Sequence, residues 1–325
     1  MSVAILGAGA FGTALASLIA ARGQSVHLYA DDPATANEIA TRRTNERRLP
    51  GFTVDARVVA TADLREATAA ARLLILAVGS PRVPELLRAL GEVTSGRHML
   101  VHAIGAPMGV TRTVSDLVRA ETSIKRVGVL AGPALSRDLA ERRPCAVVVA
   151  SPFDEVIGAT RAALDTPGAL RVYGSHDLVG VELASAISGS LTVALGLADG
   201  LGVGAGPRAV LVCRSVAEGT RLTVAAGGKE RTFSGMAGLG NLLVRSEPRS
   251  ADRSDDYRLG LEIARGEPRS RVETEGSRAA VQGLKFAERV GVRARLLGAV
   301  AAVVHGGVPV SDAAARLAEG AAEEE

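Results

Sequence analysis

Three glycines near the N-terminus have a spacing that suits phosphate binding. They belong to Gly7-Ala8-Gly9-Ala10-Phe11-Gly12, between an apolar run at 2–6 and a helical pattern at 13–22. In a strand, turn and helix of this kind, the first glycine permits the tight turn, the second admits a pyrophosphate, and the third packs the helix on the strand. The helix N-terminus then faces the phosphates. The segment therefore predicts a dinucleotide site; the alternative is a glycine-rich turn without a ligand.

Two carboxylates stand about 20 residues further on, where such sites bind the ribose. Asp31 and Asp32 follow a second apolar run at 25–29. A carboxylate there accepts hydrogen bonds from the ribose hydroxyls and repels a 2′-phosphate, so Asp31 favours NAD over NADP. Asp32, which precedes Pro33, is explained nearly as well as the cap of the next helix.

The elements that would position these residues alternate between strands and helices. Strand-like runs recur at 73–78, 98–104, 127–130 and 146–150, with helical patterns between several of them. This alternation predicts an α/β fold with a mostly parallel, doubly wound sheet.

The pattern changes at about residue 180. The stretch 180–206 begins as a helix that is apolar on every side, which predicts burial, and its few polar groups would then be hydrogen-bonded or face a cleft. Further helices are expected at 210–225, 256–265, 277–290 and 295–304. We therefore expect a Rossmann-type domain at 1–180 and an all-helical substrate and dimerisation domain at 181–325.

Length and composition narrow the class of protein. The 325 residues exceed the usual size of one domain. Apolar residues make up 47 %, but both long uncharged runs are too short or too broken by glycine for a membrane span. The net charge of +3 and the eight aromatic residues argue against nucleic-acid binding. Cys145 and Cys213 are isolated, so we expect neither a disulfide nor a metal site, and the N-terminus lacks a signal-peptide pattern, which favours a cytoplasmic location.

Several ordered motifs resemble the NAD(P)-dependent glycerol 3-phosphate dehydrogenases of bacterial type, over almost the whole chain. The matching segments are GAGAFGTALA at 7–16, Asn45 with Leu49-Pro50, GPALSRDLA at 132–140, DGLGVGAG at 199–206, Arg214 with Ala217-Glu218, TFSGMAGLGN at 232–241, and Glu275-Gly276. The resemblance implies a Rossmann domain followed by a helical substrate domain, a homodimer, and an active site in the cleft between the domains.

The resemblance preserves the residues on the cofactor side. Ala10 and Phe11 match the family's backbone contacts to the pyrophosphate. Ser136 falls where a small residue lies near the nicotinamide, and Glu275 falls at a residue close to the carboxamide. On local sequence alone, Glu275 is equally well a carboxylate at a helix start.

The resemblance does not preserve the substrate side. The family's lysine after the strand that ends near Ile104 falls at Gly105. The other replaced positions are Ser188 and Gly189 for the catalytic lysine and the next asparagine, Asn241 for an aspartate, Arg245 for a threonine, and Asp255 and Asp256 for an arginine-asparagine pair. A shift of the last segment would bring Arg253 or Arg258 to the phosphate instead.

These replacements alter the expected chemistry. Hydride delivery to a ketone builds an alkoxide, which a desolvated lysine neutralises well at neutral pH. Ser188 can donate a hydrogen bond but does not readily give up a proton. The three lysines, Lys125, Lys229 and Lys285, lie in other segments. His102 is the titratable group near the altered loop, and a structural histidine at a strand end is the alternative.

Three functions are compatible with these residues. The first is a family oxidoreductase for a small phosphorylated or polar substrate, with a changed substrate or proton donor and weak or absent activity on glycerol 3-phosphate. The second is a dinucleotide-binding sensor or regulator without turnover. The third is ordinary glycerol 3-phosphate dehydrogenase activity through groups that the pattern does not identify. We favour the first.

Overall fold

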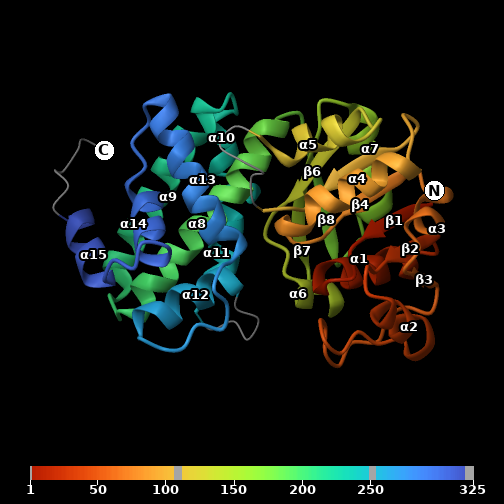
Figure 1. Ribbon diagram of the computed structural model, residues 1–325, viewed down its shortest axis with the longest axis horizontal. Helices are drawn as coiled ribbons and strands as arrows, with labels where there is room; N and C mark the ends of the chain where they lie inside the picture. The colour runs from red at the N-terminus through yellow and green to blue at the C-terminus, as the bar shows by residue number, and fades with distance from the viewer. Residues whose placement is uncertain (1, 106–111, 249–253, 319–325) are drawn as a thin grey trace. The chain divides into compact units, whose positions relative to one another are not determined.

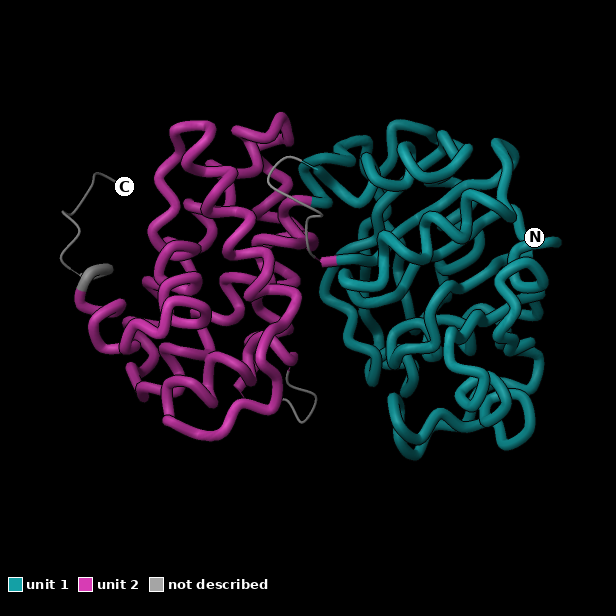
Figure 2. Tube along the Cα trace, in the orientation of Figure 1, with its two compact units in different colours: residues 1–104, 112–182 teal, residues 105–111, 183–325 magenta. Residues whose placement is uncertain are grey.

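The chain folds into two compact units (Figures 1 and 2). The computed structural model describes residues 2–105, 112–248 and 254–318. The first unit contains the chain up to Ile104 and residues 112–182, and the second contains Gly105 and the chain from Leu183 onward. The boundary at Glu182 and Leu183 lies two residues after the one expected from the sequence.

The first unit is built on one eight-stranded sheet. The strands are β1 (Val3–Leu6), β2 (Val26–Tyr29), β3 (Val58–Thr61), β4 (Leu73–Leu76), β5 (Met99–His102), β6 (Arg126–Ala131), β7 (Cys145–Ala150) and β8 (Leu170–Ser175). Their order is β3-β2-β1-β4-β5-β6-β7-β8. Neighbouring strands are parallel in every pair except β6–β7, which is antiparallel. The predicted doubly wound, mostly parallel sheet is confirmed; the edge strands β3 and β8 were not predicted.

Helices pack on both faces of this sheet. They are α1 (Ala10–Ala21), α2 (Pro33–Arg42), α3 (Leu64–Ala69), α4 (Val83–Val93), α5 (Val114–Glu121), α6 (Ser136–Ala140) and α7 (Asp154–Leu164), with a short 3₁₀ turn η1 at Ser80–Arg82. Central strands such as β1 and β4 are buried at every residue because both of their faces are covered. The strand order reverses at β1, so β1 and β4 form the switch point at which doubly wound sheets bind ligands.

In its described residues, the second unit is helical, as predicted. Its elements are α8 (Leu178–Gly200), which starts in the first unit, α9 (Ala205–Ala225), α10 (Glu230–Phe233), a π-helical turn (Met236–Gly240), α11 (Asn241–Arg245), α12 (Asp255–Ala264), α13 (Glu275–Val290), α14 (Arg295–Val304) and α15 (Val310–Ala318). Glycines let α8 and α12 pack backbone to backbone, since a Cβ at Gly196 would lie 2.2 Å from the Tyr257 carbonyl oxygen.

Helix α8 is the long apolar helix of the structure. Among the described helices it is the one long and apolar enough to span a membrane. However, 89 % of its most apolar window is buried inside the protein. This burial is that of a core helix, so α8 is weak evidence for a span.

Candidate functional site

The turn after β1 has the geometry of a phosphate cradle. Gly7 has a φ of +125°, and a Cβ there would lie 2.5 Å from the Ala77 carbonyl oxygen. A Cβ at Gly12 would lie 2.0 Å from the Gly7 carbonyl oxygen, so both positions require glycine for the protein's own packing. At Gly9, however, a Cβ would meet only the Ala77 oxygen at 4.0 Å. The absent side chain of Gly9 therefore leaves open space, which is what an approaching pyrophosphate needs.

The start of α1 adds hydrogen-bond donors to this cradle. No side chain caps the helix at Gly9, and its first turn carries no acidic residue. The first amides of a helix have no partner within it, so those of Ala10 and Phe11 can bind an anion. Asn45 is 1 % exposed, and its Nδ2 donates to the Ala8 carbonyl oxygen and the Thr13 Oγ1, both at 2.9 Å. This amide fixes the turn, and the sequence pattern did not show that role.

The two carboxylates after β2 have separate roles. Asp32 caps α2, because its side chain accepts from the Ala34 amide at 3.1 Å and from the Thr35 hydroxyl at 2.6 Å. The bond from Thr35, followed by that from Ala34, lowers the pKa of Asp32. Asp31 does not cap the helix; its Oδ2 lies 2.5 Å from the Nη2 of Arg82. Asp31 is therefore the carboxylate that can turn to a ribose.

Ser136 and Glu275 begin α6 and α13, respectively. The Glu275 Oε1 accepts from the Arg278 Nη2 at 3.2 Å, and the side chain is 27 % exposed. This contact corresponds to a carboxylate at a helix start. For both residues, contact with the nicotinamide stays a prediction.

His102 lies in a closed polar cluster of the first unit. It ends β5 and is fully buried, with its Nε2 3.2 Å from the Glu182 Oε1 and 3.3 Å from the Ser115 Oγ. Glu182 also accepts from the Ser115 amide at 3.1 Å. Burial raises the pKa of Glu182, but the His102 charge and these hydrogen bonds outweigh it, and the net pKa is lowered. This environment corresponds to the structural alternative, and a catalytic role for His102 stays a prediction.

Ser188 and Asn241 come together in the second unit. Ser188, on α8, is fully buried; its Oγ donates to the Ser185 carbonyl oxygen at 2.8 Å and accepts from the Asn241 Nδ2 at 3.0 Å. Asn241 starts α11 and is 7 % exposed. The hydroxyl is thus occupied as donor and as acceptor, and neither group changes its charge near neutral pH.

An ion pair lies beside this neutral pair. The Arg245 Nη2 contacts the Asp256 Oδ2, and Asp256 is 1 % exposed. The other Asp256 oxygen accepts from the Gly276 amide at 2.8 Å. A Cβ at Gly105 or Gly189 would lie 3.9 or 3.7 Å from the Arg245 Nη1. The guanidinium of Arg245 is therefore next to two of the replaced family positions.

The carboxylates of Asp255 and Asp256 would repel a phosphate if they stood alone, but both have cationic partners. Asp255 pairs with the Arg271 Nε at 2.8 Å, and Asp256 pairs with Arg245. Each carboxylate is thus largely compensated by a cation. Of the two arginines considered as substitutes, Arg258 is exposed on α12, and Arg253 lies outside the described residues.

Comparisons with known proteins agree with the fold and show the family. A family model described as the NAD-dependent glycerol-3-phosphate dehydrogenase N-terminus matches residues 2–156, and the model of the corresponding C-terminus matches residues 177–315. A glycerol-3-phosphate dehydrogenase [NAD(P)+] of Cupriavidus necator is 36 % identical, with all of both chains covered. The enzyme of the same description from Leptothrix cholodnii is 35 % identical over 98 % of this chain and 97 % of its own.

Solved structures give the same result. The glycerol-3-phosphate dehydrogenase of Coxiella burnetii superposes with a TM-score of 0.91 at 27 % identity, covering 98 % of each chain. A yeast glycerol-3-phosphate dehydrogenase shares the fold, with a TM-score of 0.82 at 18 % identity over 98 % of this chain and 99 % of its own. The expected NAD cofactor agrees with the cofactor in the family's description. The chain belongs to the NAD-dependent glycerol-3-phosphate dehydrogenase family.

Proposed function

We propose that this chain is an NAD(H)-binding oxidoreductase of its family whose turnover of glycerol 3-phosphate and dihydroxyacetone phosphate is weak or absent. Its substrate is then another small phosphorylated or polar compound. Family membership supports the reaction class. The replaced residues of the second unit support the change of substrate or rate.

The residues of the first unit fit the cofactor. The open space at Gly9 and the amides of Ala10 and Phe11 would hold the pyrophosphate, while Asp31 would accept from the ribose hydroxyls. When bound, the nicotinamide supplies or accepts a hydride. No acidic residue in the first turn of α1 opposes the phosphates.

The hydrogen bonding of Ser188 carries the proposal. Its hydroxyl stands at the family's catalytic lysine, and it donates to a backbone oxygen while accepting from Asn241. A group held in this way would have to lose its present acceptor before donating to a substrate oxygen. Neither Ser188 nor Asn241 can deliver a proton near neutral pH, and loss of a general acid costs roughly 10² to 10⁴ in rate.

Arg245 is a cation close to these positions. Its side chain is 20 % exposed and is paired with Asp256. A guanidinium remains protonated in proteins, so Arg245 can stabilise a negative charge but cannot replace a proton donor. A second candidate function follows, in which the chain binds a dinucleotide as a sensor or regulator without turnover.

One pair of measurements separates these functions. Calorimetric titration with NADH measures binding, and a steady-state assay with NADH and dihydroxyacetone phosphate measures turnover. We expect binding with turnover at least about a thousandfold below the family's usual rate. Turnover with another ketone would favour the altered enzyme, and binding without turnover of any ketone would favour the sensor. Ordinary turnover of dihydroxyacetone phosphate would refute the proposal.

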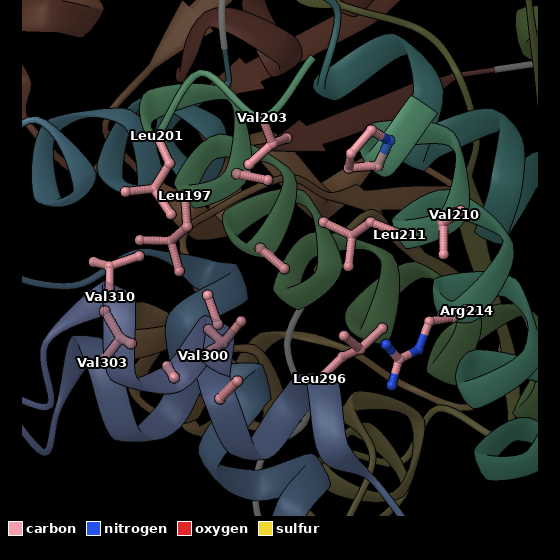
Figure 3. A pocket seen from close by; sticks show the side chains of 16 residues that line it. Leu197, Leu201, Val203, Val210, Leu211, Arg214, Leu296, Val300, Val303 and Val310 are labelled. Atoms are coloured by element: carbon pink, nitrogen blue, oxygen red, sulfur yellow. The ribbon is translucent and has the colours of Figure 1, made fainter. Parts of the chain in front are cut away.

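We also propose a homodimer built mainly from the helical unit. A groove of about 470 Å³ lies among α8, α9, α14 and α15, and Arg214 is the one charged residue among its described lining residues (Figure 3). At its edge, Leu201 is 44 % exposed and Val210 is 58 % exposed. Apolar surface of this kind favours cover by another protein surface, and a second copy is the occupant that the family resemblance implies.

A cytoplasmic location completes the proposal. Cys145 and Cys213 are both free thiols, as suits a reducing compartment. Burial, followed by the charge of Asp138, raises the pKa of Cys145 to about 11, so this thiol stays protonated at neutral pH. Protonated thiols react slowly, and we assign Cys145 no chemical role.

A further inference from the structure

Arg82 and Asp31 form an ion pair at the ligand-binding end of the sheet. Asp31 follows β2 and Arg82 ends η1, the turn after β4. Strand β1 lies between β2 and β4, and the Gly7–Gly12 turn leaves its carboxyl end. The Arg82 Nη2 therefore reaches the Asp31 Oδ2, at 2.5 Å, from the opposite side of the strand that carries the phosphate cradle.

The charged groups around this pair are mostly acidic. Glu85 lies 3.8 Å from the Arg82 Nε and is 76 % exposed. Asp63 caps α3, and Asp32 caps α2. Burial, then the charge of Asp31, raises the pKa of Tyr29, and Glu85 and Asp63 act in the same direction while Arg82 opposes them. Arg47, whose charge helps to lower the pKa of Asp32, is a further cation near this edge. Without Arg82, the acidic groups would still outnumber it and oppose an additional phosphate.

The pair itself is free to exchange partners. The Arg82 side chain is 55 % exposed and that of Asp31 is 48 % exposed. Exposed ion pairs of this kind are weak, because water screens both charges. A guanidinium binds a phosphate through two parallel hydrogen bonds, which are stronger than bonds between neutral groups.

We propose that Arg82 determines how strongly this protein discriminates NADPH from NADH. With NADH, Asp31 accepts from the ribose hydroxyls while Arg82 keeps its carboxylate in place. With NADPH, Arg82 leaves Asp31 and binds the 2′-phosphate, so the second cofactor is accepted despite the acidic residue. The inference rests on the proposed dinucleotide binding and adds the residue that sets its specificity.

The test is calorimetric titration of the full chain with NADH and with NADPH, which requires no turnover. In the unmodified protein we expect NADH to bind more tightly, by no more than about tenfold. Arg82→Gln should weaken the binding of NADPH by at least about tenfold and change the affinity for NADH by less than about threefold, since a charged hydrogen bond is lost to one ligand only. Asp31→Asn should act in the opposite sense, with tighter binding of NADPH and weaker binding of NADH.

Arg88→Gln is the matched control. Arg88 lies on the exposed face of α4, and its Nε donates to the Pro84 carbonyl oxygen at 3.2 Å. The Arg88→Gln variant should leave the ratio of the NADPH and NADH affinities unchanged. Titration of 2′,5′-ADP against 5′-ADP isolates the phosphate contact from the nicotinamide half and should give the same pattern.

The outcomes separate this inference from the proposed function. If the unmodified protein binds neither cofactor, both fail. If it binds NADH but Arg82→Gln changes both affinities equally, or leaves the ratio as it was, the assignment of Arg82 is overturned while dinucleotide binding stands.

Discussion

Arg245 and Asp256 must be replaced together by the residues of the family in any attempt to restore glycerol 3-phosphate turnover. By the family resemblance, they replace a threonine and an asparagine, and the structure joins them in one ion pair. Asp256 is 1 % exposed. Replacing Arg245 alone would leave a buried carboxylate without its cation, which typically costs about 3 to 5 kcal/mol of stability.

Arg245 also opposes a new lysine in this cluster. A Cβ at Gly105 would lie 3.9 Å from the Arg245 Nη1. At a separation of about 5 Å and an effective dielectric constant of about 20, two like charges repel by about 3 kcal/mol. A repulsion of that size lowers the pKa of a lysine by about two units. From an ordinary pKa of about 10.4, such a lysine would keep most of its charge at neutral pH. The repulsion would instead favour side-chain conformations that hold its ammonium group away from the cluster.

Two multiple variants test this reasoning. The first carries Ser188→Lys, Gly105→Lys and Asn241→Asp; the second adds Arg245→Thr and Asp256→Asn. Reduction of dihydroxyacetone phosphate by NADH should stay within about tenfold of the unmodified protein in the first, and rise by at least about a hundredfold in the second. Thermal unfolding and NADH titration check that each variant is folded and loaded.

The result that would refute the pairing argument is equal activity in the two variants. If the second multiple variant folds and binds NADH but still does not reduce dihydroxyacetone phosphate, a reshaped pocket limits the reaction, and the loss of these groups does not. The rate effects of these groups need not multiply, because residues that act as one unit are strongly non-additive.

Four further predictions concern the rest of the chain. His102→Leu should lower the free energy of unfolding by about 3 to 5 kcal/mol in urea denaturation, because Glu182 stays buried without its partner, and adding Glu182→Leu should recover most of the loss. Since the pKa of Glu182 is lowered from 4.5, its stabilisation is present above that pH and disappears as the pH falls through the lower folded value; acid unfolding of Glu182→Gln should lack this component. Gly9→Val should abolish NADH binding in calorimetry with little change in melting temperature, since that side chain would enter open space; a large loss of stability would contradict this. Val210→Asp should convert a dimer to a monomer in light scattering, whereas Val224→Asp, on the same helix but outside the groove, should not; a monomeric unmodified protein would refute the interface.

The strands show which part of the fold the sequence could predict. Interior strands such as β4 are buried on both faces and read as continuous apolar runs. The edge strands β3 and β8 mix buried and exposed residues, so they lack the continuous apolar run that marks an interior strand. Helices α8, α9, α12, α13 and α14 were predicted because their apolar residues repeat at helical spacing. The nine-residue helix α15 was not predicted, and α10 and α11 were missed because they are too short to show a period.

The candidate site divides in a similar way. The glycine turn was predictable because phosphate binding requires a fixed local spacing, and the ribose role of Asp31, which rests on the same spacing, stays a prediction. The partners of these residues were not predictable, because they come from distant segments. Arg82 reaches Asp31 from beyond a separate strand, and Glu182 reaches His102 from α8. No local pattern in the chain marks either contact.

The cluster of Ser188, Asn241, Arg245 and Asp256 is better explained as a new set of paired polar groups than as the result of simple loss of the family's site. Among the described residues, buried side-chain atoms without a hydrogen bond occur elsewhere, for example in His27 and His98, and none belongs to Ser188, Asn241, Arg245 or Asp256. Stability alone does not explain the charges, because a buried ion pair can often be replaced by apolar residues at no cost. The ion pair of Arg245 and Asp256 therefore supports the proposed change of substrate, since a guanidinium beside the replaced positions can bind a polar or anionic ligand. This argument favours ligand binding at the cluster whether the ligand is turned over or only sensed.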